Sequence, residues 1–253
     1  MNIEELISLL PSSVTQDGDI IIPDHVWKRF FQFLNLNKND VLVHFNCGKN
    51  NAIKIAITDH SIKKAIGFEC NKNLKTYAEK NTKDFQQVSI LSSFKKYDLS
   101  DATIILITSV HNIDTDYLIN KLEKELGINA KIGTFWAPLG NMLPQKVNFP
   151  FILSQKPFKY SDNIRDQIQY IYGTRCIDFT ASWLLSEKYI KTFETIPSGQ
   201  LRFVNMLMSM IVWINAWNLN VACEEEIPPP VQTYLGILKT FFNIDLTNLF
   251  NRK

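Results

Sequence analysis

The chain of 253 residues is long enough to bury a sizeable hydrophobic core, either as one large domain or as a domain with a substantial extension. Hydrophobic residues make up 45% of it and charged residues 21%, which is typical of an ordinary globular protein. The formal net charge of +2 is too small to indicate a protein that binds nucleic acid or an anionic membrane surface.

The four cysteines, Cys47, Cys70, Cys176 and Cys223, are widely separated and include no C-x-x-C pair. This spacing argues against a zinc ribbon or a thioredoxin-like redox pair, and we expect reduced thiols, as is usual in the cytosol. The acidic start of the chain, residues 1–5, lacks the basic region of a signal peptide. The sequence therefore predicts a cytoplasmic protein without a metal site.

Residues 1–39 predict an N-terminal helical segment that caps the rest of the fold. A short helical pattern from Glu4 to Leu10 ends at Pro11, and a β-like run follows at Ile20–Ile22. Asp24 is then placed to cap a second helix. The apolar residues of this helix recur at helical spacing, at Val26, Phe30, Phe33 and Leu34.

Residues 40–142 alternate short apolar runs with helical patterns. The predicted strands are Val41–Phe45, Ala65–Phe68, Val88–Leu91, Thr103–Thr108 and Lys131–Trp136. The predicted helices between them are Asn51–Thr58, Asn73–Thr82 and Asp116–Leu126. This alternation predicts the α/β class: a doubly wound, Rossmann-like and mainly parallel sheet, with Val41–Phe45 central and helices on both faces.

Residues 143–253 predict a mainly helical C-terminal region. The run Phe149–Phe158 predicts one or two further strands. The predicted helices are Asp162–Tyr172, Ile177–Phe193, Leu201–Ala222 and Val231–Phe242, with a stiff break at Pro228–Pro230 before the last.

The apolar segment Phe203–Ala222 has the length of a bilayer span. It contains asparagines, however, whose amides are costly in hydrocarbon without partners: Asn205, Asn215, Asn218 and Asn220. We therefore expect no transmembrane span but a buried helix, with Trp217 in a helical core. Near-complete exposure of Trp213 and Trp217 together would instead indicate a partner or membrane surface.

The stretch VLVHFNCGKNN, Val41 to Asn51, has the pattern of a ligand-binding loop. An apolar run stops abruptly before Cys47-Gly48, and a second apolar segment starts at Ala52. A strand, a tight turn and a helix N-terminus in this order are typical of sites that hold a nucleotide-like ligand. Such loops normally carry several glycines, whereas this loop carries one.

Four segments between Ile22 and Leu126 resemble a known family in order and spacing. They read IPDHVWKRFFQFLNLNKNDVLVHFNCGKNNAIKIAI, KKAIGFECNKNLKTYAEKN, YDLSDATIILI and KLEKEL. The pattern is similar to that of class I S-adenosylmethionine (SAM)-dependent methyltransferases, and most of all to the small archaeal protein-lysine methyltransferases. The resemblance covers Ile22 to Trp136 and implies a Rossmann-like fold, SAM as cofactor and a protein or small-molecule methyl acceptor.

The first motif of this family, D-x-G-C-G-x-G, aligns with the letters HFNCGKN. Only Cys47 and Gly48 match it, while His44 replaces the acid and Asn46 and Asn50 replace glycines. Asparagine readily adopts positive φ, so we expect the turn to keep its shape. Glycines also let the ligand approach the backbone closely, and the asparagine side chains face the space that a cofactor would use. The resemblance therefore implies a retained turn with a weakened pocket.

An acid ends the second predicted strand, Glu69, about twenty positions after Gly48. An acid at this distance accepts hydrogen bonds from ribose hydroxyls, and a surface glutamate is the alternative. Ser92 and Ser93 follow the third strand, where the family lines its adenine pocket. The cofactor-binding residues that the resemblance implies are His44, Asn46, Cys47, Gly48, Lys49, Glu69, Cys70 and Ser92.

Methyl transfer asks a protein chiefly for positioning and a deprotonated acceptor. His111 follows the fourth predicted strand, at the sheet edge where the acceptor should lie, and is a weak candidate for a base. A solvated loop histidine is the more common alternative. No other catalytic residue is indicated.

Two functions remain open from the sequence. The first is a SAM-dependent methyltransferase-like protein acting on a protein or small-molecule acceptor. The second is a non-catalytic relative that binds a protein partner through its helical C-terminal region. A dinucleotide-binding oxidoreductase fits less well, because a single glycine departs even further from G-x-G-x-x-G.

Overall fold

The computed structural model describes residues 15–16, 19–110, 113–193 and 199–250. The chain divides into two compact units, of which one comprises residues 13–162 and the other includes residues 163–253. We call them the sheet unit and the helical unit. The helix predicted at Glu4–Leu10 lies outside the described residues.

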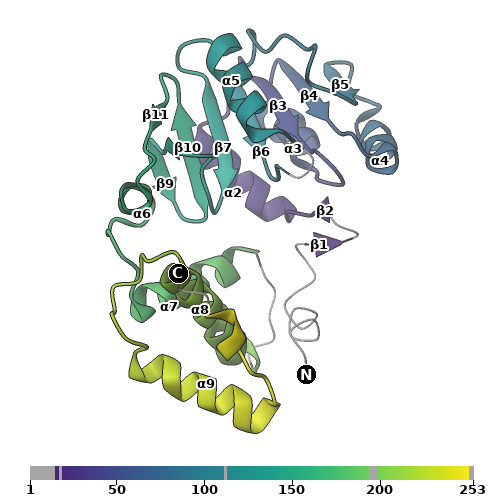
Figure 1. Ribbon diagram of the computed structural model, residues 1–253. Coiled ribbons are helices and arrows are strands. Elements are labelled where there is room, and N and C mark those ends of the chain that lie inside the picture. Colours follow the sequence, from purple (N-terminus) through teal and green to yellow (C-terminus); the bar gives the residue numbers. More distant parts are fainter. Residues whose placement is uncertain (1–14, 17–18, 111–112, 194–198, 251–253) are drawn as a thin grey trace. The chain divides into compact units, whose positions relative to one another are not determined.

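The sheet unit contains a seven-stranded sheet in the order β5-β4-β3-β6-β7-β10-β9 (Figure 1). The bounds are β3 Val41–Phe45, β4 Lys64–Phe68, β5 Val88–Leu91, β6 Ile104–Ile107, β7 Lys131–Phe135, β9 Lys146–Asn148 and β10 Phe151–Gln155. The strands from β5 to β7 pair in parallel, and β10 pairs antiparallel with both β7 and β9. The predicted mainly parallel sheet with a central Val41–Phe45 strand is therefore confirmed.

Burial on both faces explains why the central strands read as continuous apolar runs. Every residue of β3 and of β6 is buried. A strand of a parallel sheet that is covered on both sides has no solvent face, so it shows no polar alternation. This local signal is the reason that the sequence predicts these strands to within one or two residues.

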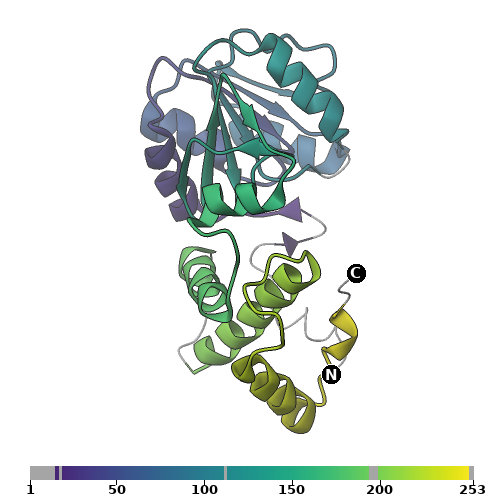
Figure 2. The same ribbon diagram turned by 60° about the vertical axis from the view of Figure 1, so that its left-hand side comes forward.

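Helices cover both faces of the sheet, as expected for a doubly wound fold (Figures 1 and 2). On one face lies α2 (Asp24–Leu34), whose Trp27 ring is 5.3 Å from that of Phe135. The helix α3 (Ala52–His60) lies on the same face. On the other face, α5 (Thr115–Glu125) packs Leu118 into a cluster with Val43. The helix α4 (Lys72–Thr82) follows β4.

Four short strands complete the sheet unit. The strand β1 (Thr15–Gln16) pairs antiparallel with β2 (Asp19–Ile20), and β8 (Met142–Leu143) pairs antiparallel with β11 (Lys159–Tyr160). Because β8 to β11 belong to the sheet unit, this unit continues about twenty residues beyond the alternating pattern from which the sequence predicts it.

The helical unit consists of α6 (Ile164–Tyr172), α7 (Phe179–Phe193), α8 (Leu201–Asn218), α9 (Pro229–Phe242) and the 3-10 turn η1 (Thr247–Leu249). Its core includes Trp213, which is fully buried, and Trp217, which is 9% exposed, so the predicted helical core is confirmed. Within the described residues, none of the helices combines the length and the hydropathy that a bilayer crossing requires.

A disulfide joins Cys176 to Cys223, so the expectation of reduced thiols is wrong for these two cysteines. The backbone brings them together, since Ile177 donates its N–H to the carbonyl of Val221, and Cys223 donates its N–H to the carbonyl of Ile177. This pairing ties the start of α7 to the turn after α8. The other two thiols, Cys47 and Cys70, are free.

Candidate cofactor site

The turn after β3 has the backbone geometry of a ligand-binding loop. Asn46 has φ of 51° and Gly48 has φ of 48°, so both adopt the left-handed conformation. The prediction that asparagine would keep this turn at position 46 is therefore confirmed. The N–H of Cys47 donates to the carbonyl of Phe68 at 3.2 Å, which anchors the turn to the end of β4.

Glu69 holds this turn from the neighbouring strand. Its carboxylate is buried and accepts two backbone N–H groups, from Gly48 at 3.0 Å and from Asn71 at 2.9 Å. An ionised carboxylate has about four acceptor positions, so two of them are not used by these bonds. The acid thus fixes the loops after β3 and β4 and keeps capacity for a ligand.

The site lies at the topological switch point of the sheet. From β3 the chain proceeds to β4 on one side, while β6 lies on the other, and ligands of open α/β sheets bind in the crevice outside such strand ends. Here the Asn46 side chain donates its amide N–H to the carbonyl of Ser109 at 3.0 Å. The asparagine side chain therefore joins the loop after β3 to the loop after β6.

A cavity of about 170 Å³ lies at the carboxyl ends of β3, β4 and β5. Its lining residues are Phe45, Asn46, Phe68, Glu69, Cys70, Ser92, Ser93, Phe94, Lys95 and Ile113. Small-molecule sites typically measure about 300–1,000 Å³, so the cavity is narrow for a nucleoside-sized ligand. Of the predicted cofactor-binding residues, it brings together Asn46, Glu69, Cys70 and Ser92.

Phe94 and Lys95 are lining residues that the sequence analysis missed. The Phe94 ring packs at 5.1 Å from that of Phe45 and at 6.1 Å from that of Phe68, both in T-shaped contacts. The signal for them was their position, directly after Ser93 at the carboxyl end of β5. An aromatic ring and an ammonium group at this edge give the cavity an apolar wall with a cationic rim.

The remaining predicted residues do not line the cavity. His44 lies on the opposite face of the sheet, fully buried against Trp27 at a ring distance of 5.4 Å. Cys47 is 2% exposed and packs below the turn, where a Cβ on Gly67 would come within 2.9 Å of its sulfur. Gly48 and Lys49 belong to the turn itself, without contributing to the lining.

Burial also sets the protonation of His44. Its removal from water lowers its pKa to about 3, so the ring is neutral at physiological pH. Its Nε2 lies 3.5 Å from the Thr108 hydroxyl, while its Nδ1 has no hydrogen-bond partner among the described residues. The neutral His44 ring therefore packs in an aromatic layer, at the position where the family's first motif has an acid.

Asn50 differs from Asn46 in its role. Its side-chain oxygen accepts the N–H of Ile22 at 2.8 Å in a buried bond. The expectation that both asparagines face the cofactor space is thus wrong for Asn50, which does not line the cavity and instead fixes the segment before α2. His111, the candidate base, lies outside the described residues.

Comparisons with known proteins find similarity over part of the chain only. No family model matches the chain. A protein-lysine N-methyltransferase from Saccharolobus islandicus (strain REY15A) is 29% identical over 114 residues, which are 44% of this chain and 70% of that protein. The resemblance of the middle part of the chain to class I methyltransferases is confirmed.

Solved structures similar to the chain include an RNA methyltransferase from Salinibacter ruber in complex with S-adenosyl-L-homocysteine. It is 19% identical, with a TM-score of 0.49, over 56% of this chain and 96% of that chain. A SAM-dependent O-methyltransferase from Thermotoga maritima is 17% identical, with a TM-score of 0.39, over 53% of this chain and 49% of that chain.

Proposed function

We propose that the protein is a SAM-dependent methyltransferase-like protein that binds its cofactor weakly at the switch point of its sheet. The observation that carries this proposal is the turn with two left-handed residues, Asn46 and Gly48, tied to the buried Glu69 carboxylate. A turn, an acid and a following helix in this arrangement suit a ribose-bearing ligand.

Different described residues would contact different parts of the cofactor. The Glu69 carboxylate accepts two backbone N–H groups and has further acceptor positions. With these it would accept hydrogen bonds from the ribose hydroxyls. Gly48 adopts the positive φ that the turn requires, and its N–H holds the Glu69 carboxylate in place. Ser92 and Phe94 lie at the β5 edge of the cavity, where they would border the adenine.

Weak binding follows from the Asn46 side chain and from the small cavity. The hydrogen bond from Asn46 to Ser109 must break, or the crevice must widen, before a cofactor can enter. Either step uses binding energy and lowers the observed affinity by the fraction of molecules that are open.

SAM supplies an activated methyl group when it is bound, so the chain has to position an acceptor and exclude water. The acceptor would lie at the carboxyl ends of β6 and β7, beside the cavity. A protein amine is the first acceptor to test, because the relative with 29% identity is named a protein-lysine methyltransferase. A small-molecule acceptor remains the second class.

The alternative is a non-catalytic protein that uses the same fold as a binding or scaffold module for a protein partner. The observation that favours it is the hydrogen bond by which the Asn46 side chain joins the loops after β3 and β6. The helical unit, which has a hydrophobic core of its own, would then bind the partner.

Calorimetric titration with SAM and with S-adenosylhomocysteine tests the proposal. We expect weak, saturable binding of both, which Glu69→Ala abolishes because the ribose loses its acceptor. Glu79→Ala, which removes an exposed acid from α4, should leave the binding unchanged. If neither ligand binds at millimolar concentration, the proposal of a SAM-dependent protein is wrong.

A further inference from the structure

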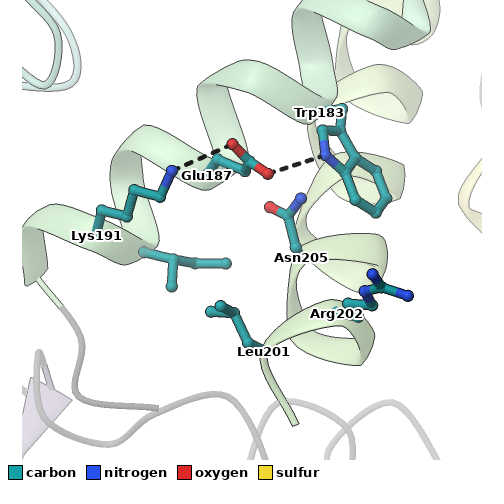
Figure 3. A pocket seen from close by; sticks show the side chains of 7 residues that line it. Trp183, Glu187, Lys191, Leu201, Arg202 and Asn205 are labelled. Atoms are coloured by element: carbon teal, nitrogen blue, oxygen red, sulfur yellow. Dashed lines mark hydrogen bonds and ion pairs between the residues drawn. The ribbon is translucent and has the colours of Figure 1, made fainter. Parts of the chain in front are cut away.

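The helical unit contains a second cavity, of about 180 Å³, between α7 and the first turns of α8 (Figure 3). Its lining residues are Trp183, Glu187, Ile190 and Lys191 from α7, and Leu201, Arg202 and Asn205 from α8. The cavity is smaller than the roughly 300 Å³ at which pockets for drug-sized ligands begin, so it has room only for a small molecule.

Asn205 is a buried polar group that lacks a partner. The residue is 3% exposed, and its side-chain oxygen accepts no hydrogen bond from any described residue. Figure 3 shows its amide directed into the space between Glu187 and Trp183. A buried acceptor of this kind is costly unless a donor meets it, and most such groups in folded proteins are satisfied. The cavity therefore calls for a ligand with an N–H or O–H group at this point.

Glu187 places an acid beside this acceptor. It accepts a hydrogen bond from the Trp183 indole N–H at 3.3 Å and one from the Lys191 ammonium at 3.4 Å. Both distances lie beyond the usual range for N–H···O bonds, so these contacts are weak and exchangeable. A carboxylate and an amide oxygen side by side, next to an indole ring, favour a positively charged donor such as an ammonium group.

Arg202 supplies the opposite charge at the other end of the cavity. It is exposed, and its guanidinium makes no hydrogen bond or ion pair with the residues that the structure describes. In Figure 3 it lies on the α8 side, away from Lys191. A guanidinium is the side chain best suited to hold a carboxylate, because its planar fork donates two parallel bonds.

Apolar groups complete the cavity. Ile190 is 3% exposed, and Leu201 and Trp183 border the same space. The cavity thus combines two acceptors, Asn205 and Glu187, with one cation, Arg202, and with aliphatic side chains. A ligand that fits it carries an ammonium group, a carboxylate and an aliphatic side chain.

We propose that this cavity binds a free α-amino acid with an aliphatic side chain. Its ammonium group would donate to Asn205 and Glu187, its carboxylate would accept from Arg202, and its side chain would pack on Ile190. The proposal concerns the helical unit alone and does not depend on the cofactor site.

Titration calorimetry on the full chain with three probes tests the proposal. L-leucine carries all three groups, leucinamide lacks the carboxylate and represents the N-terminal residue of a peptide, and 4-methylpentanoate lacks the ammonium group. We expect saturable binding of leucine and at least tenfold weaker binding of the other two. Leucinamide offers no carboxylate to Arg202, and 4-methylpentanoate offers no N–H donor to the buried Asn205 oxygen. Equal binding of leucine and leucinamide, or no saturable binding of leucine at millimolar concentration, would overturn the proposal.

Variants separate the two ends of the ligand. Arg202→Gln, a surface change, should lower the affinity for leucine to that for leucinamide while leaving leucinamide unchanged. Asn205→Leu, which keeps the branched shape but has no polar atoms, should abolish leucine binding. Lys188→Gln serves as the matched control, since it removes an exposed cation from α7 outside the cavity. Leucine affinity that Arg202→Gln leaves intact would contradict the proposal even if Asn205→Leu failed to fold.

Discussion

The buried carboxylate of Glu69 accepts the N–H of Gly48 at 3.0 Å, although the two residues are 21 positions apart in the chain. Its second oxygen accepts the N–H of Asn71 at 2.9 Å. One acid thus sets the shape of two neighbouring loops at the carboxyl edge of the sheet, before any ligand is considered.

Glu69→Gln should therefore loosen both loops. The amide keeps the size of the side chain but turns one acceptor into a donor, which opposes one of the two backbone N–H groups. We expect a local loss of about 1.5–3 kcal/mol, the range for a hydrogen bond to a charged group. Hydrogen exchange of the Gly48 and Asn71 amides measures it, and Glu79→Gln on α4 is the control. Unchanged exchange at both amides would show that the carboxylate does not hold the turn.

Asn50→Ala should destabilise the sheet unit without weakening the cofactor site. It removes the acceptor of the buried Ile22 N–H, a change that costs about 1–3 kcal/mol. Urea unfolding gives the loss, and titration with SAM gives the affinity. A fall in affinity in step with the fall in stability would mean that Asn50 contributes to the site after all.

The buried His44 should make folding sensitive to acid. Burial lowers its pKa to about 3 from 6.5, so the unfolded state binds a proton that the folded state refuses between these values. The stability contributed by the neutral ring is complete above pH 6.5 and is lost as the pH falls toward 3. We expect a loss of about 2 kcal/mol between pH 7 and pH 5 from this residue.

His44→Leu isolates this contribution. The free energy of unfolding, measured by urea titration at pH 7 and pH 5, should fall less in the variant than in the wild type. The exposed His25, changed to Gln, is the control for a histidine outside the core. An equal pH dependence in the wild type and in His44→Leu would contradict the account of His44.

The disulfide should stabilise the helical unit. It closes a loop of 47 residues, and the chain-entropy model gives a loop of this length about 4 kcal/mol at most. The double change Cys176→Ser and Cys223→Ser should lower the unfolding temperature, whereas Cys70→Ser should not. Thiol titration of the unfolded chain offers a direct check, since the detection of all 4 cysteines as free thiols would refute the bond.

The sequence predicts the elements of this fold well because their signals are local. Val41–Phe45 is a strand with the predicted bounds, since its apolar run has no polar alternation. The predicted helix Leu201–Ala222 instead ends at Asn218, because Asn220 adopts φ of 56° and Val221 donates back to the carbonyl of Ala216. The apolar composition of the run hides this turn, although Leu219 and Asn220 are exposed in it.

Long-range pairings escaped prediction. The spacing of Cys176 and Cys223 does not indicate their disulfide. Likewise, nothing in the sequence around Ser109 indicates its hydrogen bond with Asn46. The resemblance to a family pointed to the turn and to Glu69, which a hydrogen bond joins, yet it also grouped His44 with residues from which the sheet separates it. A side chain at a strand end faces one side of the sheet only, and alternation along β3 puts His44 and Phe45 on opposite sides.

The central claim is that Asn46 keeps the turn while narrowing the site, and the SAM affinity of Asn46→Gly tests it most directly. Glycine adopts φ of 51° without strain and removes the side chain that bridges to Ser109. Calorimetric titration should show weak binding to the wild type and a tenfold or greater gain in Asn46→Gly, about 1.4 kcal/mol or more. Tight binding to the wild type that Asn46→Gly leaves unchanged or weakens would contradict the claim and make Asn46 a ligand of the cofactor.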